Sequence, residues 1–288
     1  KKKEQVQEPT VEIQPIEYET QAIEETANVL FKPNPGPQTD FLAAAEREVL
    51  YGGSAGGGKS YAMLSDPLRY MGHPAFSGLL LRHTTEELRE LVFKSQELYP
   101  KIWPGIKWSE RKMQWTAPSG ARLWMSYLDR DDDVLRYQGL AFSWIGFDEL
   151  TQWATPYAWN YMRSRLRSTA PDLPIYMRAT TNPGGRGHHW VKKMFIDPAP
   201  YNRAYDATDI ETGEVLRYPA GHAKAGRPLY KRRFIPARLS DNPYLAESGD
   251  YEAMLLSMPE QQRRQLLDGD WDIKEGAAFT EFDRNIHV

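Results

Sequence analysis

The stretch Tyr51-Gly52-Gly53-Ser54-Ala55-Gly56-Gly57-Gly58-Lys59-Ser60 decides the fold that this sequence predicts. From Gly53 it fits the pattern G-x-x-x-x-G-K-S/T of a phosphate-binding loop, or P-loop. Such a loop turns several backbone N–H groups toward a triphosphate, and glycine permits this close approach because it has no Cβ. Lys59 would supply a cation for the β- and γ-phosphates, and the Ser60 hydroxyl would hold Mg²⁺.

The flanking residues agree with this interpretation. Val49 to Tyr51 is typical of a short buried strand that enters the loop, and Ser60 to Tyr70 is typical of a helix that leaves it. A flexible Gly/Ser turn that happens to precede a lysine is the alternative, and it does not explain the ordered strand, loop and helix. We therefore expect the nucleotide to contact every residue of the loop: Gly53, Ser54, Ala55, Gly56, Gly57, Gly58, Lys59 and Ser60.

The composition sets mild limits. The 288 residues allow a substantial core, and one large domain with a smaller appendage is the natural expectation. A net charge of −3 means that any DNA-binding surface must be local, and the absence of cysteine excludes disulfides, thiolate zinc sites and a cysteine nucleophile. No apolar run approaches the roughly 18–20 residues needed to cross a bilayer, and no signal peptide precedes the fold. We expect a soluble intracellular protein without a membrane partner.

A second motif runs from Phe142 to Glu149. It is a mostly apolar strand that ends in two carboxylates, Asp148 and Glu149. This pattern suits a Walker B element, in which Asp148 would hold Mg²⁺ through water and Glu149 would polarise the water that attacks the γ-phosphate. The adjacent glutamate is typical of P-loop proteins that hydrolyse nucleotides, rather than of kinases. The sequence therefore predicts an NTPase.

Other polar residues are candidates for contacts with the nucleotide. A strand from Leu173 to Ala179 runs into Thr180-Thr181-Asn182-Pro183, where Thr181 and Asn182 could sense the γ-phosphate by hydrogen bonds. The alternative is an ordinary turn that ends the strand, because Asn-Pro-Gly is strong turn chemistry. The amide of Gln38 could pair with both edges of adenine, or Gln38 could be a surface residue.

Two further segments frame the predicted sheet. Gly78 to Arg82 is a second buried strand, and Thr84 to Glu87 then forms a capping box for a helix, which places Arg82 at the carboxyl edge of the sheet. Residues 112–128 read as a hairpin turned at Pro118-Ser119-Gly120, and its second arm is a candidate sheet strand.

Charged stretches leave some alternatives open. Asp129 to Asp133 favours a solvated loop over a metal site, and the neighbouring His188 and His189 lack other obvious metal ligands. A helix is expected from Tyr157 to Ser168. The segment from Ala220 to Leu239 carries six basic residues and no acidic one, so it could contact a phosphate backbone or form a subunit interface. These basic residues are Lys224, Arg227, Lys231, Arg232, Arg233 and Arg238.

The order of these motifs resembles the ATPase domain of the large terminase subunit of tailed bacteriophages, the motor that packages DNA into proheads. The resemblance spans about residues 30 to 275. The Walker elements are shared across the superfamily, whereas the later blocks point to terminases. The matching pieces are Gln38, the P-loop, Ile145-Gly146-Phe147-Asp148-Glu149-Leu150, Ser164-Arg165-Leu166-Arg167, Thr180-Thr181-Asn182-Pro183, Asp241-Asn242-Pro243-Tyr244-Leu245 and Gly269-Asp270-Trp271.

This resemblance implies a fold and an organisation. The fold class is α/β, a P-loop NTPase of the additional-strand (ASCE) type with a mostly parallel central sheet flanked by helices, plus a small helical lid. We expect four segments along the chain. These are a flexible acidic arm (1–28), an ATPase core (29–220), a linker or lid subdomain (221–275) with a helical run from Tyr251 to Leu267, and the start of a connection (276–288) to a C-terminal nuclease domain.

The resemblance also implies roles for residues. ATP and Mg²⁺ would be the cofactors, with Lys59 on the phosphates, Ser60 and Asp148 on the metal, and Glu149 as catalytic base. Gln38 would contact adenine, and Thr180 to Asn182 would couple hydrolysis to movement. Family motors use an arginine finger that reaches a neighbour's γ-phosphate; Arg136 is the first candidate and Arg82 the second, although Arg136 could simply be a surface loop arginine.

The implied partners are double-stranded DNA, further copies in a homo-oligomeric ring (a pentamer by resemblance), the portal protein and the small terminase subunit. The protein would act in the host cytoplasm, docked transiently on the prohead and absent from the mature virion. Many terminase P-loops carry an arginine, which is missing between Ser54 and Gly57 here, so that role must lie elsewhere.

Because the chain stops about where the nuclease domain would begin, we expect it to hydrolyse ATP without cutting DNA. Two other functions share these motifs. One is a helicase or other DNA-remodelling ATPase, and the other is a nucleotide-gated assembly module with little turnover.

Overall fold

The computed structural model describes residues 31–199 and 201–273. The predicted acidic arm and the predicted connection to a nuclease domain lie outside these residues. The chain divides into two units after Lys32, and the fold below is that of the unit beginning at Pro33.

Within the described residues, nine strands form one sheet in the order β3-β4-β5-β2-β6-β7-β1-β9-β8. The strands are β1 (Glu48–Gly53), β2 (Ser77–Arg82), β3 (Lys107–Ser109), β4 (Gln114–Thr116), β5 (Arg122–Tyr127), β6 (Trp144–Asp148), β7 (Tyr176–Thr181), β8 (Ala204–Asp206) and β9 (Lys231–Ala237).

The six strands from β5 to β9 in this order are parallel, while β3, β4 and β8 pair antiparallel at the two edges. Strand β7 lies between the P-loop strand β1 and the Walker B strand β6, which is the additional strand that the fold class requires. The predicted α/β fold with a mostly parallel sheet is confirmed. Since parallel strands share one carboxyl edge, β1, β2, β6 and β7 all end on the same side of the molecule.

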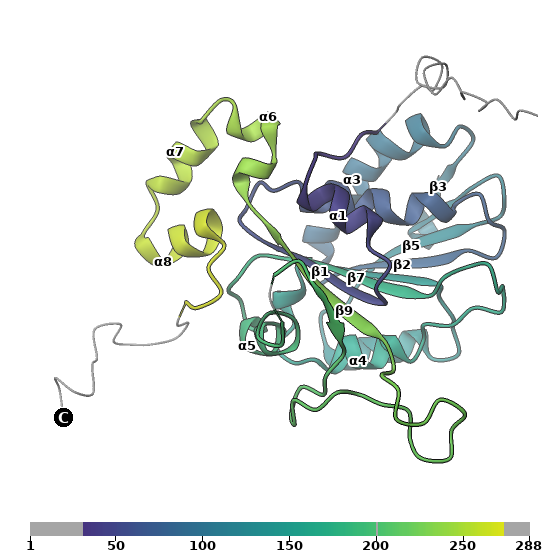
Figure 1. The fold of residues 1–288 in the computed structure, drawn as a ribbon. Coiled ribbons are helices and arrows are strands. Elements are labelled where there is room, and N and C mark those ends of the chain that lie inside the picture. The colour runs from purple at the N-terminus through teal and green to yellow at the C-terminus, as the bar shows by residue number, and fades with distance from the viewer. Residues whose placement is uncertain (1–30, 200, 274–288) are drawn as a thin grey trace, which may run out of the picture. The chain divides into compact units, whose positions relative to one another are not determined.

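Helices cover both faces of the sheet. They are α1 (Pro37–Ala43), α2 (Lys59–Ser65), α3 (Thr85–Ile102), α4 (Tyr157–Arg163) and α5 (His188–Val191). The helices α6 (Pro243–Ala246), α7 (Asp250–Leu256) and α8 (Glu260–Arg263) lie beside the sheet and form the helical lid (Figure 1). Helices α1 and α3 lie on one face of the sheet, and α4 and α5 lie on the other (Figure 1). The alternation of strand side chains builds both cores: Leu80 packs toward α2 and α3, while Leu79 and Leu81 pack toward α4 and α5.

Helix α3 begins as the sequence predicts. Thr84 accepts a hydrogen bond at Oγ1 from the Glu87 N–H, and the Glu87 carboxylate accepts one from the Thr84 N–H, both at 3.3 Å. This capping box satisfies two N–H groups at the helix start. It also fixes the part of α3 that later supplies two residues to the functional site.

The boundary of the helical lid differs from the expected one. Residues 231–237, which the sequence analysis assigned to the lid, form β9 and pair with β1 in the main sheet. The helical part begins only after this strand. The arginines of β9 made this segment look like an exposed surface in the sequence. In the structure Arg232 is only 1% exposed, and Glu48 neutralises its charge inside the protein. The expected helical run from Tyr251 is also interrupted, since α7 and α8 are separated at Pro259.

A buried ion cluster ties three elements together at the amino ends of the strands. The Glu48 carboxylate of β1 is fully buried and accepts hydrogen bonds from Arg232 Nε of β9 and Arg163 Nε of α4, each at 2.6 Å. Burial alone would raise the pKa of Glu48, but the two guanidinium charges and their hydrogen bonds more than offset it, so the pKa is lowered.

We expect Glu48→Gln to lower the free energy of unfolding by about 3–5 kcal/mol at neutral pH, because it leaves Arg232 buried without its counter-charge. The lowered pKa means that the carboxylate stabilises the fold fully above its ordinary value of 4.5 and loses this effect as pH falls through the folded-state pKa. Urea unfolding from pH 7 downward measures both effects. The exposed Glu214→Gln is the control, and equal stability of the two variants would contradict the assignment.

Candidate nucleotide-binding site

Four strand ends converge at the carboxyl edge of the sheet. Gly53 ends β1, Arg82 ends β2, Asp148 ends β6 and Thr181 ends β7. The P-loop leaves β1 at this edge and passes directly into α2 at Lys59. The topology therefore brings the two predicted nucleotide motifs together.

The P-loop needs glycine at its two ends. Gly53 has φ 141°, and a Cβ at this position would collide with the backbone of Ala237 at the end of β9. Gly58 precedes α2 in the left-handed region at φ 76°, and a Cβ there would lie 2.7 Å from the Gln38 amide nitrogen. A side chain at Gly53 would push the loop away from Ala237, and a side chain at Gly58 would push it away from Gln38.

Lys59 is buried among charges of the site. Its Nζ donates a hydrogen bond to the Ser54 carbonyl at 2.5 Å, within the same loop. Burial lowers the pKa of Lys59, while the charges of Glu149 and Asp148 act in the opposite direction. Because the ammonium is anchored to a backbone carbonyl, a phosphate oxygen could replace that acceptor without moving the loop.

The Walker B carboxylates have different surroundings. Asp148 is 1% exposed, accepts a hydrogen bond from the Thr180 hydroxyl, and has Oδ2 3.1 Å from Arg82 Nε. Glu149 follows with φ 61°, an uncommon conformation for a residue other than glycine, and its Oε2 lies 3.4 Å from the Asn182 backbone nitrogen. Burial and the neighbouring Asp148 raise the pKa of Glu149, against the opposing charges of Lys59 and Arg82.

A cavity of about 360 Å³ lies beside these groups. It is lined by Ala55 to Ser60 of the P-loop together with Glu149 and Asn182, so these predicted residues are brought together. Its wall also contains residues that the sequence analysis missed. They are Tyr61 of α2, Glu90 and Lys94 of α3, and Asn242, Leu245 and Tyr251 from the helical lid.

The predicted role of Thr181 in this site needs correction. Its hydroxyl lies 2.7 Å from the Thr151 hydroxyl and is buried away from the cavity. Successive side chains of a strand point to opposite faces, so Thr180, and not Thr181, faces Asp148. Of the two threonines, it is Thr180 that contacts the Walker B aspartate.

Gln38 is a buried neighbour of the P-loop and is hydrogen-bonded to its backbone. It is 4% exposed, so the alternative of a surface glutamine is wrong. Its Oε1 accepts a hydrogen bond from the Asn34 N–H at 2.6 Å, and its Nε2 donates one to the Gly58 carbonyl at 2.9 Å. Both edges of the amide are therefore engaged with backbone, and the contact with adenine stays a prediction that would require these partners to exchange.

The two candidate arginine fingers differ in their surroundings. Arg82 is 9% exposed and paired with Asp148 of its own chain, so its charge serves its own site. Arg136 is exposed on a 3₁₀ turn (Asp131–Tyr137), where Nη2 donates to the Tyr127 carbonyl at 2.7 Å and Nε to the Asp133 carbonyl at 3.2 Å. Arg136 stays the candidate for a contact with another subunit.

The lid contacts the P-loop directly, which the sequence analysis did not foresee. The Ala55 N–H donates to the Leu266 carbonyl at 2.7 Å, and Asn242 Nδ2 donates to the Gly56 carbonyl at 2.6 Å. The Asp-Asn-Pro-Tyr-Leu block that begins at Asp241 was noted only because it resembles a family motif. Its own sequence does not predict the hydrogen bond from Asn242 to Gly56, which lies 186 residues earlier in the chain.

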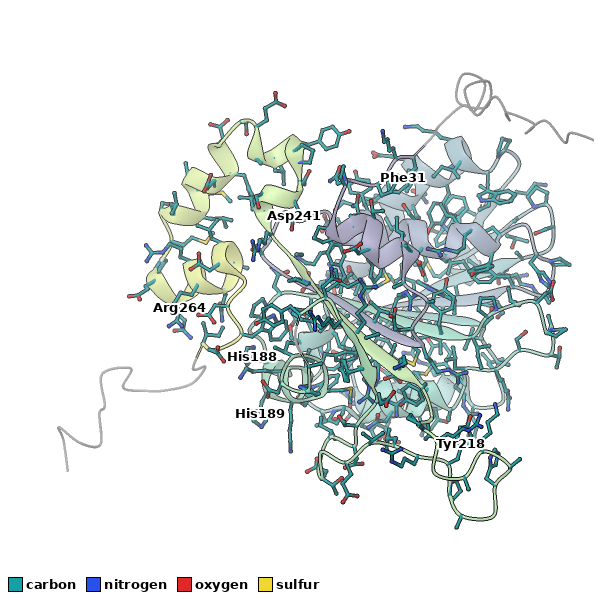
Figure 2. All side chains as sticks on the ribbon, in the orientation of Figure 1. Phe31, His188, His189, Tyr218, Asp241 and Arg264 are labelled. Carbon is teal, nitrogen blue, oxygen red and sulfur yellow. The ribbon has the colours of Figure 1, made fainter. Side chains whose placement is uncertain are left out.

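The basic stretch after Ala220 divides into two parts. Three of its members serve the sheet: Lys231 pairs with Asp206, Arg232 with Glu48, and Arg233 with the Asn202 side-chain oxygen. Lys224 and Arg227 instead lie exposed on the loop between β8 and β9, where Lys224 Nζ is 5.8 Å from the centre of the Tyr218 ring and the Arg227 carbonyl accepts a hydrogen bond from the Tyr218 N–H. Figure 2 labels Tyr218 on this loop, and the exposed Arg238 follows the end of β9.

Other charged groups serve the structure. In the described part of the chain, no group of three or more acidic or histidine side chains could hold a metal. The carboxylate of Asp133 accepts hydrogen bonds from the backbone of its own turn. His188, labelled in Figure 2, stacks on Trp271 and accepts a hydrogen bond from the Gly184 N–H at 2.9 Å. Among the described helices, none is long and apolar enough to cross a membrane.

We expect Gln38→Ala to weaken the binding of ATP and of inorganic tripolyphosphate alike, by about tenfold, because it removes the hydrogen bond that holds the Gly58 carbonyl of the P-loop and leaves that carbonyl without this partner. Isothermal titration calorimetry with both ligands measures this effect, and the exposed Gln138→Ala is the control. Loss of ATP affinity with unchanged tripolyphosphate affinity would instead assign Gln38 to the base.

Comparisons with known proteins agree with this architecture. The profile of the family described as "Terminase large subunit, T4likevirus-type, N-terminal" matches residues 50–286. A comparison with the curated proteins finds no match.

Two solved structures share the fold. The large terminase of a thermophilic bacteriophage, in complex with ADP, superposes with a TM-score of 0.59 at 15% identity, over 88% of this chain and 57% of that one. The ATPase domain of the large terminase of Thermus phage P74-26 superposes with a TM-score of 0.51 at 13% identity, over 84% of this chain and 94% of that one. The matched region is thus little more than half of the ADP-bound terminase.

Proposed function

This chain belongs to the family of the large terminase subunit, T4likevirus type, N-terminal part, and we propose that it is an ATPase that drives DNA packaging. In this proposal it hydrolyses ATP and couples hydrolysis to the translocation of double-stranded DNA into a prohead. The observation that carries the proposal is that Glu149 lines the cavity beside the P-loop, and that the charges of Glu149 and of the buried Asp148 both act on Lys59 of the loop.

The residues of the site fit a magnesium ion with the triphosphate. Among the described residues, Asp148 Oδ2 is buried, faces Arg82 and accepts no well-formed hydrogen bond, and the Ser60 hydroxyl lines the neighbouring cavity. Carboxylate and hydroxyl oxygens are ligands that Mg²⁺ prefers. When bound, the ion would neutralise charge on the β- and γ-phosphate oxygens. Asp148 and Ser60 would hold it.

The remaining steps belong to the side chains of this chain. The P-loop N–H groups and Lys59 bind the phosphates, and Glu149 takes the proton of the attacking water. A base must be deprotonated to act, and the raised pKa of Glu149 makes its carboxylate a stronger proton acceptor than an ordinary glutamate. Asn182 fixes this carboxylate through its backbone N–H.

The proposed assembly is a homo-oligomeric ring, of five subunits by resemblance, that works with the portal protein and the small terminase subunit on the prohead in the host cytoplasm. The exposure of Arg136 supports a role for it as the finger that reaches a neighbour's γ-phosphate. In this proposal, nuclease activity is expected only in the full-length protein.

We expect Glu149→Gln to bind ATP but to lose turnover by about 10²–10⁴-fold, the usual contribution of a general base. In the unaltered protein, turnover should rise with pH through the raised pKa of Glu149, because the carboxylate must be ionised to accept a proton. Steady-state phosphate release across pH measures both, with the exposed Glu247→Gln as control. Full turnover by Glu149→Gln would refute the assignment of the base.

We expect turnover per subunit to rise with protein concentration and to fall by about 10³–10⁵-fold in Arg136→Ala, the size of effect that an arginine finger has. Mixing Arg136→Ala with Glu149→Gln should restore part of the turnover, because one variant keeps an intact site and the other an intact finger. The exposed Arg111→Ala is the control. Turnover strictly linear in protein, with no recovery in the mixture, would contradict a finger supplied by a neighbour.

A further inference from the structure

The helical lid is packed against the apex of the P-loop. Gly56 has φ 78°, and a Cβ at this position would lie 2.9 Å from Tyr251 Cε1 and 3.1 Å from Leu245 Cδ1. The same stretch of loop is hydrogen-bonded to the lid through Asn242 and through the Leu266 carbonyl. The lid is thus a fixed neighbour of the loop.

The cavity beside the P-loop has polar and apolar walls. Its charged and polar residues from the core, Lys59 and Ser60 among them, match the needs of a triphosphate. Its large apolar side chains are Tyr61 from α2, and Leu245 and Tyr251 from the lid. A nucleotide also carries a base and a sugar, which gain most from apolar and aromatic surface.

The two tyrosines are not equivalent. Lys94 Nζ lies 5.9 Å from the centre of the Tyr61 ring, so a cation already approaches that ring. Within residues 31–199 and 201–273, neither an aromatic ring nor a cation stacks on Tyr251, which is half-buried at the cavity wall. Burial raises the pKa of the Tyr251 hydroxyl, so the ring stays neutral at physiological pH.

We propose that the base of the bound nucleoside triphosphate lies against the lid, with Tyr251 stacking on it and Leu245 completing the apolar surface. This inference rests on the proposed function, which places the phosphates at Lys59 and Ser60. Gln38, the residue that the sequence suggested for adenine, does not line the cavity and holds backbone with both edges of its amide.

A physical consequence distinguishes this site from one built on the core alone. The phosphates bind the core and the base binds the lid, so one nucleotide bridges both. Removing Tyr251 therefore weakens only ligands that carry a base, whereas removing a phosphate-binding group weakens every triphosphate.

The experiment compares Mg·ATP with inorganic tripolyphosphate, which has the phosphates without base or sugar. Binding is measured by isothermal titration calorimetry on the full chain for the unaltered protein, Tyr251→Ala, Tyr251→Phe and the control Tyr157→Ala, an exposed tyrosine on α4 at the other face of the sheet. Circular dichroism verifies that each variant is folded.

We expect Tyr251→Ala to weaken ATP by about tenfold or more, in the range of aromatic stacking on a base, and to leave tripolyphosphate within about twofold. Tyr251→Phe and Tyr157→Ala should bind both ligands like the unaltered protein. Unchanged ATP affinity in Tyr251→Ala, or an equal loss for both ligands, would overturn the inference. Failure of the unaltered protein to bind either ligand would instead overturn the proposed function.

Discussion

The contact between the P-loop backbone and the end of β9 is the constraint on which the site depends. Gly53 lies so close to Ala237 that no Cβ fits between them, and the Ser54 N–H donates to the Ala237 carbonyl at 2.8 Å. This contact fixes the start of the loop beside the last residue of β9. Because the lid follows immediately after Ala237, the same contact also sets where the lid leaves the core.

Two buried groups of charges lie at opposite ends of the strands and differ in how well they are satisfied. Glu48 at the amino end of β1 has two arginines at 2.6 Å, an arrangement that fixes elements in place. At the carboxyl end, Asp148 accepts a hydrogen bond from Thr180 at one carboxylate oxygen, but its Oδ2 faces Arg82 without a well-formed hydrogen bond, and burial raises the pKa of Glu149. Incomplete pairing and a shifted pKa are typical of groups that await a ligand.

Much of the fold could be predicted from the sequence, because the signals are local. The P-loop, the Walker B strand and the capping box at Thr84 each depend on residues close together in the chain, and parallel strands then bring their carboxyl ends to one edge. The strand β9 could not be found in this way. Its arginines look like a solvated surface until Glu48, far away in the sequence, is known to neutralise Arg232.

The details of the site depended on contacts that no local pattern contains. Whether Thr180 or Thr181 faces the Walker B aspartate depends on the phase of β7, and a shift of one residue exchanges their roles. The lid residues Leu245 and Tyr251 join the cavity only through tertiary packing. The sequence suggested Gln38 for a contact with adenine, whereas its amide donates a hydrogen bond to the Gly58 carbonyl of the P-loop.

The pairing of β1 with β9 also has a consequence for how this protein folds during its synthesis on the ribosome. Glu48 and Arg232 are 184 residues apart in the chain, and synthesis at about 5–20 residues per second separates them by roughly 10 to 40 seconds. During that interval the P-loop has been synthesised, but β9, which contacts the start of the loop at Ala237, has not. The nascent chain must carry an unpaired β1 edge until Ala237 emerges, so the pace of translation decides when a nucleotide can first be held.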